Sequence, residues 1–507
     1  MTVFILVSGM FTGPHVWHDT AALLTAAGSD VRTVPLGGLD GVRAAPGPVV
    51  DLESHIADVV AVIDSVLRGA HAEIVLVGHD YGIHPVVGAA DRRAASIARI
   101  VHLDSGLPRD GVPALAAVAD PQLREEVIRR SAGGGTAAAE LPPPAREEWQ
   151  LWGSVAGVPD AALDRLTEQA GPQPMATLLQ PLSLTGALAP VPLTGVLCTA
   201  GGAGIALVQS RVDLGEPSLQ AWAGPRRTFF ELPTGHWPML SSPDELARTL
   251  LRAAAGEGHR LTPANAAAPP AHLRPFLLDV PVAPVERVAH VDLHLPSAPG
   301  PRPAVLIVHG GPVPAGAAPA PREWPGMTGY ARYAAAHGVM GVTVEHRLHD
   351  VADYERAAAD VAAAVELVRS DPRVDADRIA LWFFSGSGLL SAEWLASPPS
   401  WLRCLAANYP IMAPLPGWGR FGSRFRPADA VAHAGDLPLV LVRAGLESDG
   451  IAVTVEAFLD SAKRHGADVE VVDVPDGHHG FEAVDPTDAS RDAVHRAMRA
   501  VLGRLTA

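Results

Sequence analysis

Residues 74–83 carry a side chain whose type and spacing could do nucleophilic chemistry. The stretch reads Ile-Val-Leu-Val-Gly-His-Asp-Tyr-Gly-Ile, and its central Asp80 has glycines two positions before and two positions after it. This pattern is typical of a nucleophile elbow, a sharp strand-to-helix turn whose flanking glycines avoid clashes between strand and helix. A carboxylate can attack carbon without first losing a proton. The pattern therefore indicates Asp80 as a candidate covalent nucleophile.

A second stretch of this kind ends a strand pattern at 378–382 and continues as Phe-Phe-Ser-Gly-Ser-Gly. Ser385 stands at the position of the nucleophile. Phe383, two residues earlier, occupies a place where a small residue normally relieves crowding. Ser387 is an alternative in a shifted register, but Leu389 then fills the next position that should be small. The sequence favours Ser385.

The first half of the chain alternates strand and helix patterns. A helical, irregular stretch without a clear strand covers 107–182. Strands are expected at 4–7, 30–35, 74–77, 97–103, 192–199 and 227–232. Helices are expected at 17–27, 51–67 and 243–255. Such alternation predicts an α/β fold whose mostly parallel sheet is covered by helices on both faces.

The same alternation begins again in the second half. Strands are expected at 288–295, 304–308, 339–344, 378–382, 437–443 and 469–474, with a helix at 354–368. Between the halves, residues 256–275 are rich in Gly, Pro and Ala and offer little to bury. We therefore expect a domain at 1–255 with a cap at about 107–182, a linker at 256–275 and a second domain at 276–507.

The order of parts in residues 1–255 resembles the α/β-hydrolase family, in which an insertion at this point is a cap over the active site. An Asp at the elbow resembles the haloalkane dehalogenase and epoxide hydrolase branches. The resemblance implies that Asp80 attacks carbon to give an alkyl ester, which a His-activated water then hydrolyses. His236, in Thr-Gly-His-Trp-Pro-Met at 234–239, matches the family's base.

The acid that orients His236 is missing from its usual place, since residues 200–204 read Ala-Gly-Gly-Ala-Gly. Asp104, at the end of the strand after the elbow, is the alternative position and our choice. The competing interpretation is that Asp104 only caps a turn. Met10, in the loop after the first strand, and Tyr81 are the candidate oxyanion or substrate-binding positions.

Three departures from the family pattern affect this first site. Ser8 stands where the family usually has His, and Tyr81 stands where dehalogenases carry a halide-binding Trp. The expected cap contains no Tyr that could polarise an epoxide; Trp149 and Trp152 lie there, and an indole N–H can donate a hydrogen bond. An inactive or repurposed Asp80 site is therefore an alternative hypothesis.

The second half, from about residue 289 to the end, resembles α/β hydrolases of the esterase, dienelactone hydrolase and prolyl-oligopeptidase-like kind. The resemblance implies a Ser385 nucleophile with His479 as its base. The acid is expected within 444–450, where Glu447 is favoured over Asp449. An inactive elbow is the alternative here too.

The oxyanion hole of this second site is implied by the same resemblance. Gly310 and Gly311 follow His309 in a loop whose N–H groups would hold the developing charge, with the N–H of Gly386 as a second donor. His309 would shape this loop and not react.

Composition limits the classes of partner. The chain has 507 residues, 48% of them hydrophobic and 19% charged, and a net charge of −16, which argues against nucleic acid and anionic membranes. Its start resembles a strand and not a signal peptide, and no apolar run approaches the length of a membrane span. Cys198 and Cys404 have no metal-type spacing and fit buried thiols in a reducing cytoplasm. We expect a cytoplasmic protein without cofactor or metal.

The sequence thus predicts two tandem α/β-hydrolase domains acting on a small-molecule substrate. The second would cleave a carboxylic ester, thioester or lactone through a Ser385 acyl-enzyme, and the first would act on an epoxide or halogenated carbon. One alternative is that one domain, more readily the first, is a pseudo-hydrolase used for binding or scaffolding. Another is a site turned to cyclisation or elimination in natural-product biosynthesis. A homo-oligomer remains open.

Overall fold

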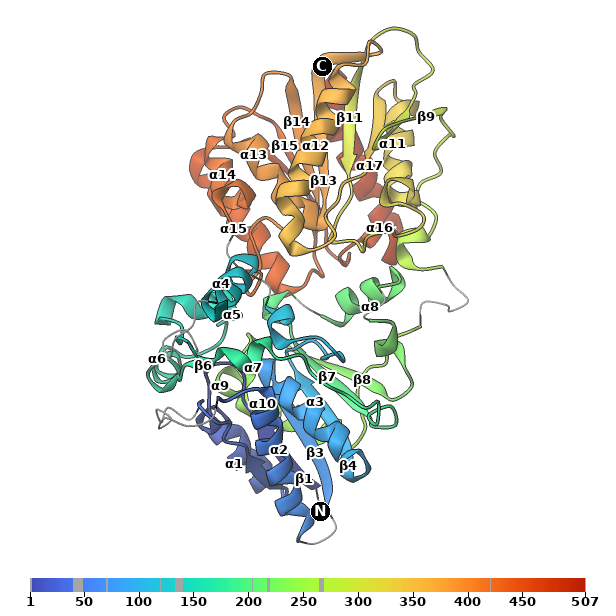
Figure 1. Cartoon of the computed structure of the whole chain (residues 1–507). Helices are drawn as coiled ribbons and strands as arrows, with labels where there is room; N and C mark the ends of the chain where they lie inside the picture. The colour runs from blue at the N-terminus through green and yellow to red at the C-terminus, as the bar shows by residue number, and fades with distance from the viewer. Residues whose placement is uncertain are drawn as a thin grey trace. The chain divides into compact units, whose positions relative to one another are not determined.

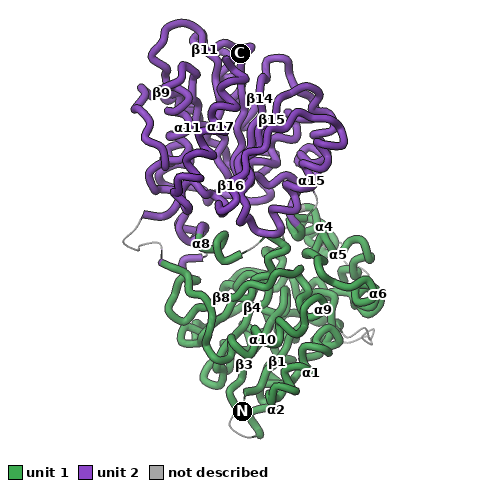
Figure 2. The backbone as a smooth tube through the Cα atoms, turned by 180° about the vertical axis from the view of Figure 1, so that it is seen from behind, with its two compact units in different colours: residues 1–209, 221–262, 416–420 green, residues 210–220, 263–415, 421–507 purple. Residues whose placement is uncertain are grey.

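The computed structural model describes residues 2–39, 49–69, 72–118, 120–132, 140–202, 204–216, 219–263, 269–419 and 421–506. Both chain ends, residues 119 and 133–139 of the expected cap, residue 203 and residues 264–268 of the expected linker lie outside these ranges. The chain divides into two compact units (Figure 2). Unit 1 comprises 1–209, 221–262 and 416–420, and unit 2 comprises 210–220, 263–415 and 421–507.

Unit 1 is built on a six-stranded sheet whose order is β2-β1-β3-β4-β7-β8. All its neighbouring strands are parallel. The strands are β1 (Thr2–Val7), β2 (Asp30–Thr33), β3 (Glu73–His79), β4 (Ile97–Leu103), β7 (Leu193–Cys198) and β8 (Arg227–Leu232). Because the central strands are buried on both faces, their sequences are nearly continuous apolar runs.

Helices cover this sheet in two pairs (Figure 1). Helix α1 (His18–Ala26) packs against α10 (Pro243–Ala254), and α2 (Leu52–Leu67) packs against α3 (Ile83–Arg92). Helix α2 begins at a capping box, in which the Asp51 side chain accepts from the N–H of Ser54 at 2.9 Å. The expectation of a mostly parallel sheet flanked by helices is confirmed.

The segment between β4 and β7 is mainly helical. It contains α4 (Pro121–Ala132), α5 (Trp149–Trp152), α6 (Asp160–Gln169) and α7 (Met175–Leu179). It also contains a pair of antiparallel two-residue strands, β5 (Glu140–Leu141) and β6 (Gln173–Pro174). The sequence pattern does not reveal these strands because two residues are too few to show an alternation. Two further helices of the first half are α8 (Ile205–Asp213) and α9 (Pro238–Ser241).

Unit 2 contains an eight-stranded sheet in the order β16-β15-β14-β13-β11-β12-β10-β9. The β9–β10 and β10–β12 pairs are antiparallel, and the other neighbouring pairs are parallel. The strands are β9 (Val285–Val288), β10 (Val291–His294), β11 (Arg302–Val308), β12 (Met340–Val344), β13 (Val374–Phe384), β14 (Leu402–Asn408), β15 (Leu439–Ala444) and β16 (Val469–Val474).

The expectation of one strand at 288–295 is wrong. The chain reverses at Ala289 and His290, and Ala289 adopts a φ of 50° there. Valines at 288 and 291 lie on either side of this tight turn, so the apolar pattern continues through the reversal and hides it.

Helices of unit 2 also lie beside its sheet (Figure 1). The longest are α11 (Pro325–Ala336), α12 (Tyr354–Arg369), α15 (Asp449–His465) and α17 (Asp488–Thr506), and the short ones are α13 (Ala392–Ala396), α14 (Pro427–Ala430) and α16 (Phe481–Val484). Val305 and Ile307 of β11 share one buried cluster with residues of α11 and α17. Across the described part of the chain, no helix combines the length and the apolar character that a bilayer crossing requires.

Candidate active sites

Asp80 lies at the turn between β3 and α3, with its backbone in the left-handed region at a φ of 49°. Only tight packing sustains such a conformation in a non-glycine residue. A Cβ on Gly78 would come within 2.6 Å of the Ile83 Cα, and a Cβ on Gly82 would meet the Ser8 carbonyl. The two glycines therefore allow α3 to start directly against the end of β3, with Asp80 at the bend.

The loop after β1 approaches the Asp80 carboxylate closely. The N–H of Met10 donates to Oδ2 of Asp80 at 3.0 Å. A Cβ on Gly9 would lie 2.8 Å from the Asp80 Cβ, so glycine is needed for this approach. Burial acts to raise the pKa of Asp80, but His236, His79 and the N–H groups of Met10 and Tyr81 outweigh it and hold the pKa below its ordinary value. The carboxylate is thus kept ionised.

His236 and Asp104 are in direct contact. The Nδ1–H of His236 donates to Oδ2 of Asp104 at 2.6 Å, and the other oxygen of Asp104 accepts the N–H of Cys198 at 2.9 Å. Burial acts to lower the pKa of His236, but the hydrogen bond and charge of Asp104, with the charge of Asp80, raise it overall. This arrangement can orient the imidazole and stabilise its cation.

A cavity of about 600 Å³ opens onto these side chains. Asp80, Asp104 and His236 line it, as do Met10 and Tyr81. The segment between β4 and β7 covers part of it: a Cβ on Gly153 would meet the His236 ring, and the N–H of His236 donates to the Ser154 carbonyl at 2.7 Å. The volume is that of an ordinary small-molecule site.

The aromatic residues expected near this site differ in whether their polar groups are available to a ligand. Trp152 lines the cavity, whereas Trp149 is buried and its indole N–H donates to Thr167 at 2.9 Å. The hydroxyl of Tyr81 is engaged away from Asp80, at 2.9 Å from Nδ1 of His55. Burial raises the pKa of Tyr81 above its ordinary value. Tyr81 therefore offers the site its backbone N–H and not its hydroxyl.

The sequence interpretation missed His84. It is buried in the cavity wall, and burial lowers its pKa to about 4, so the ring is neutral. A spacing of four residues from Asp80 puts both side chains on one face of the turn into α3. That spacing is the signal that would have found it.

The second set of residues forms a hydrogen-bonded chain in unit 2. Ser385 follows β13 at a φ of 53°, and its Oγ–H donates to Nε2 of His479 at 2.7 Å. The Nδ1–H of His479 donates to Oε2 of Glu447 at 2.5 Å. Asp449 is the first residue of α15, and Glu447 is the acid that contacts the histidine.

The glycines expected beside Ser385 lie close to it. A Cβ on Gly310 would come within 2.9 Å of the Ser385 Cβ, and a Cβ on Gly386 would meet the carbonyl of Gly311. Ser387 is fully buried, and its hydroxyl donates to the carbonyl of Phe384 at 2.8 Å. Ser385 is therefore the serine of this turn that faces the histidine.

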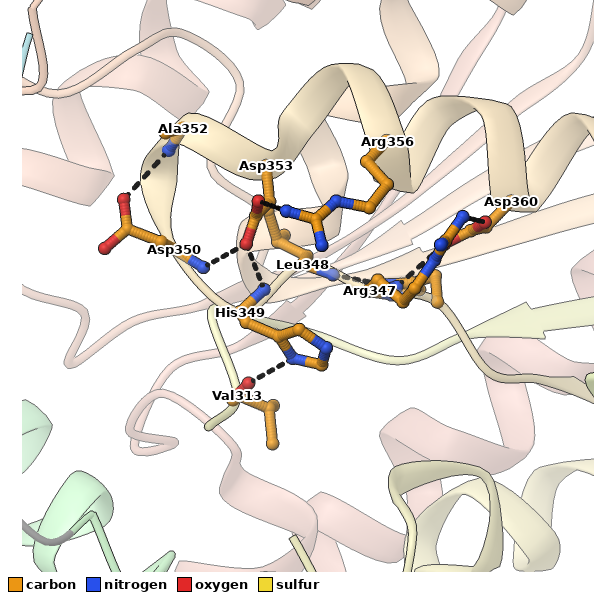
Figure 3. Close-up of polar contacts among 10 residues, drawn as sticks. Val313, Arg347, Leu348, His349, Asp350, Ala352, Asp353, Arg356 and Asp360 are labelled. Carbon is orange, nitrogen blue, oxygen red and sulfur yellow. Dashed lines mark hydrogen bonds and ion pairs between the residues drawn. The ribbon is translucent and has the colours of Figure 1, made fainter. Parts of the chain in front are cut away.

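The loop containing Gly310 and Gly311 is fastened to the segment after β12. The Nε2–H of His346 donates to the carbonyl of His309 at 2.8 Å, and the N–H of Val313 donates to the Leu348 carbonyl at 2.9 Å. Figure 3 shows the adjoining contact, in which Nδ1 of His349 bonds the carbonyl of Val313 at 2.9 Å.

That segment is itself anchored to the start of α12 (Figure 3). The N–H groups of His349 and Asp350 both donate to the carboxylate of Asp353, at 3.2 and 3.0 Å. Arg347 makes a two-pronged ion pair with Asp360, at 2.9 and 2.6 Å. These bonds give the glycine loop a rigid support.

Comparison with known proteins bears on the first half of the chain. The sequence model of the family described as "Alpha/beta hydrolase family" matches residues 4–249. A curated carbendazim-hydrolysing esterase of Nocardioides sp. (strain SG-4G) is 32% identical over 262 residues, which cover 49% of this chain and 98% of the relative. The chain belongs to the alpha/beta hydrolase family.

Solved structures that resemble this hydrolase cover about half of it. An extracellular α/β-hydrolase from a Paenibacillus species is 20% identical and covers 50% of this chain and 99% of its own, with a TM-score of 0.40. A methylesterase from Arabidopsis is 19% identical, with coverages of 50% and 99% and a TM-score of 0.38. Esterase 2 of Thermogutta terrifontis is 18% identical, with coverages of 45% and 98% and a TM-score of 0.36.

The family membership makes the chain an enzyme, an esterase-like hydrolase. In this hydrolase both cysteines, Cys198 and Cys404, are buried and unpaired. Burial raises the pKa of each thiol, to about 12 for Cys404, so neither is a reactive thiolate. The groups that the two candidate sites bring together are carboxylates, a hydroxyl and imidazoles.

Proposed function

We propose that Ser385, His479 and Glu447 form the triad of a serine hydrolase that cleaves a carboxylic ester, thioester or lactone. The observation that carries the proposal is the continuous hydrogen-bonded chain, 2.7 Å from serine to histidine and 2.5 Å from histidine to glutamate. On this proposal, residues 276–507 are a second α/β-hydrolase domain, in tandem with the first.

The geometry supports a two-step reaction. His479 takes the proton of Ser385 as its Oγ attacks the carbonyl carbon, while Glu447 stabilises the imidazolium that forms. The N–H groups of the glycine loop and of Gly386 hold the negative oxygen of the tetrahedral intermediate. The alcohol then leaves with the proton from His479, and water hydrolyses the acyl-enzyme by the same route.

Turnover of p-nitrophenyl esters tests this proposal. Ser385→Ala should abolish ester turnover, whereas Ser387→Ala, a matched control two residues away, should retain it if the protein folds normally. A fluorophosphonate probe should add its mass to the wild type and to Asp80→Ala but not to Ser385→Ala. Full ester turnover by folded Ser385→Ala would contradict the proposal.

A second candidate function concerns unit 1. We propose that Asp80 forms an alkyl-enzyme with an epoxide or a halogenated carbon, and that His236 activates the water that hydrolyses it. The contact of the Met10 N–H with Asp80, at 3.0 Å, favours this, because it can hold the oxyanion formed when water attacks the ester. The 2.6 Å bond between His236 and Asp104 supports the base.

The bonds of this reaction balance without a cofactor. The free oxygen of Asp80 bonds to carbon as the C–O bond of the epoxide or the C–X bond of the halide breaks. His236 then takes a proton from water, which attacks the carboxyl carbon of the ester and releases the alcohol. An epoxide oxygen leaves as an alkoxide and takes its proton from water.

Intact-mass spectrometry after incubation with epoxides and haloalkanes tests the Asp80 site. His236→Gln should accumulate an adduct on Asp80, and Asp80→Asn should form none. The curated relative is named for carbendazim hydrolysis, so carbendazim and simple esters belong in the same panel, measured in a Ser385→Ala background. No adduct and no turnover with any electrophile would favour the pseudo-hydrolase alternative, and a rearranged product would favour cyclisation or elimination.

A further inference from the structure

Tyr409 occupies in unit 2 the strand-end position that Asp104 occupies in unit 1. Each residue directly follows the strand after the elbow strand, β4 for Asp104 and β14 for Tyr409. Both adopt left-handed backbone conformations, with φ of 45° and 35°. Asp104 bonds His236, and the Tyr409 ring packs against His479 with centroids 4.8 Å apart. Tyr409 thus holds the place from which an acid contacts the histidine in unit 1.

A buried glutamate lies behind Tyr409. Glu482 is 7% exposed, and its Oε1 accepts from the hydroxyl of Tyr330 at 2.6 Å and from the amide of Asn408 at 2.9 Å. The indole N–H of Trp382 fixes that amide by donating to its oxygen at 2.9 Å. The other oxygen, Oε2, is buried and has no hydrogen-bond partner among the described residues.

The electrostatics of this cluster favour a neutral carboxyl. Burial raises the pKa of Glu482, although the hydrogen bonds from Tyr330 and Asn408 oppose the shift. Burial and the nearby Glu482 raise the pKa of Tyr409. The groups bonded to Glu482 are thus a phenol and an amide, neither of which carries a counter-charge.

Strain at Tyr409 adds to the case. A tyrosine at positive φ is uncommon, and such conformations persist only where the surroundings fix them. Here the N–H of Tyr409 donates to the Val442 carbonyl at 2.8 Å, and the ring packs against Phe384 and Phe481 with centroids 6.0 and 5.9 Å apart. The ring is therefore held among aromatic side chains while one side of it contacts His479.

We propose that Tyr409 is a positioning residue for His479. The proposal rests on the proposed serine-hydrolase function of this site. His479 is pinned by two hydrogen bonds, to Ser385 and Glu447, and rotation of its ring breaks both. The Tyr409 ring limits that rotation, so it affects the chemical step and not the binding of substrate.

Three variants and one matched control test the proposal. Tyr409→Ala should lower kcat for a p-nitrophenyl ester roughly tenfold or more, with KM changed less than about threefold. Tyr409→Phe, which keeps the ring, should restore most of the activity. Glu482→Gln, which keeps an acceptor for Tyr330 and Asn408, should match the wild type in kcat and in the shape of the pH profile. The control Tyr333→Phe removes the hydroxyl of a tyrosine on α11 that bonds Nδ1 of His495 at 3.1 Å. Its kcat and KM should equal those of the wild type.

A readout independent of turnover separates this proposal from the serine function. The proton shared by His479 Nδ1 and Glu447 should give a downfield NMR signal, assigned by its loss in Glu447→Gln. The signal should stay sharp in Tyr409→Phe and broaden or vanish in Tyr409→Ala. If Ser385→Ala keeps ester turnover, the serine proposal fails, while the NMR series still decides the positioning role.

The opposite results would overturn the proposal. A Tyr409→Ala enzyme with wild-type kcat and a sharp signal would remove any positioning role for Tyr409. A Glu482→Gln enzyme that loses as much kcat as Tyr409→Ala would place the effect in the buried cluster and not in the Tyr409 ring. Equal losses of kcat and melting temperature in Tyr409→Ala and Tyr333→Phe would mean that both phenols serve the core alone.

Discussion

The pKa values of Asp80 and His236 are shifted in opposite directions. The Asp80 shift favours the first step of the proposed alkyl-enzyme route, and the His236 shift affects the second. The pKa of Asp80 is lowered, against burial, by the two histidines and by backbone N–H groups, while the pKa of His236 is raised by Asp104 and Asp80. On the proposed alkyl-enzyme route, Asp80 is ionised and able to attack carbon at mildly acidic pH. A protonated His236 cannot act as a base for water, so the second step waits for deprotonation.

The first prediction follows from these opposite shifts. At pH 5 an epoxide that is a substrate should form the Asp80 adduct, because Asp80 is ionised, but the adduct should persist because His236 keeps its proton. Turnover should rise as pH increases through and beyond the ordinary range of histidine. Rapid-quench mass spectrometry at pH 5 and pH 8 measures both steps. Adduct formation at pH 8 but not at pH 5 would mean that Asp80 is not ionised at the lower pH.

Glu482 gives a second prediction at the scale of one residue. Its folded-state pKa is raised, so the folded protein keeps a proton that the unfolded chain loses as pH rises above the ordinary range of glutamate. The stability that this group contributes is therefore full at low pH and is lost as pH rises towards the raised pKa. Glu482→Gln has no such loss.

The free energy of unfolding of Glu482→Gln should therefore increase relative to that of the wild type as pH rises from 4. The increase should reach about 1.4 kcal/mol per pH unit between the unfolded-state and folded-state pKa values of Glu482. Denaturant unfolding at a series of pH values measures the difference. A difference that does not change with pH, or one that shrinks as pH rises, would show that the carboxyl is already ionised in the folded protein.

The residues that directly follow the strands position the side chains of both candidate sites. In each unit the candidate nucleophile follows one strand at positive φ, and the next strand in the chain is followed by a second residue at positive φ that contacts the histidine. The acid itself differs: Asp104 follows β4, whereas Glu447 follows β15, one strand farther along. The same topology thus has two positions from which an acid can reach the histidine.

This gives an element-scale prediction. Glu447→Ala should lower ester turnover strongly, and adding Tyr409→Asp should recover part of it, because position 409 already lies against His479. Glu482→Gln accompanies the change, because it prevents a charge on residue 482 from forming beside the new carboxylate. We expect the triple variant to regain roughly tenfold over Glu447→Ala, measured as kcat with the p-nitrophenyl ester. No gain over Glu447→Ala in a folded triple variant would contradict the equivalence of the two positions.

The sequence was informative where chemistry and backbone constraint coincide. Gly-x-Asp-x-Gly predicts the turn at Asp80 because only glycine fits the contacts at Gly78 and Gly82. Apolar runs predict the central strands because those strands are buried on both faces. The reversal at Ala289 was not predictable, since a two-residue turn leaves the pattern of valines unbroken.

The roles within the second site were less accessible from sequence. Glu447 and Asp449 are two residues apart, and only the path of the loop after β15 decides which one contacts His479. Tyr409 has the sequence character of an ordinary core aromatic. Its contact with the histidine depends on a positive φ, which no local pattern announces. One signal for the glutamate is its spacing, because Glu482 lies only three residues after His479.

At the scale of the whole molecule, each candidate nucleophile lies in the same unit as its own candidate base and acid. Asp80, His236 and Asp104 belong to unit 1, and Ser385, His479 and Glu447 belong to unit 2. Groups that share no partners contribute independently.

The fourth prediction is that the two activities separate cleanly. Ser385→Ala should lose ester turnover and keep the Asp80 adduct, Asp80→Asn should do the reverse, and the double variant should lose both. Parallel assays of p-nitrophenyl ester turnover and epoxide adduct mass measure this. A loss of adduct formation in Ser385→Ala, with the fold intact by circular dichroism, would mean that the two sites depend on one another.

The equivalent positions of Asp104 and Tyr409 suggest how the acid of such a site can change its position during evolution. A chain that carried an acid at both strand ends would keep a working histidine whichever acid was later lost. The acid could then move from one strand to the next by single substitutions, without any ancestor that lacked activity. In unit 2 the position after β14 holds a phenol, and the acid that contacts the histidine lies after the next strand of the chain.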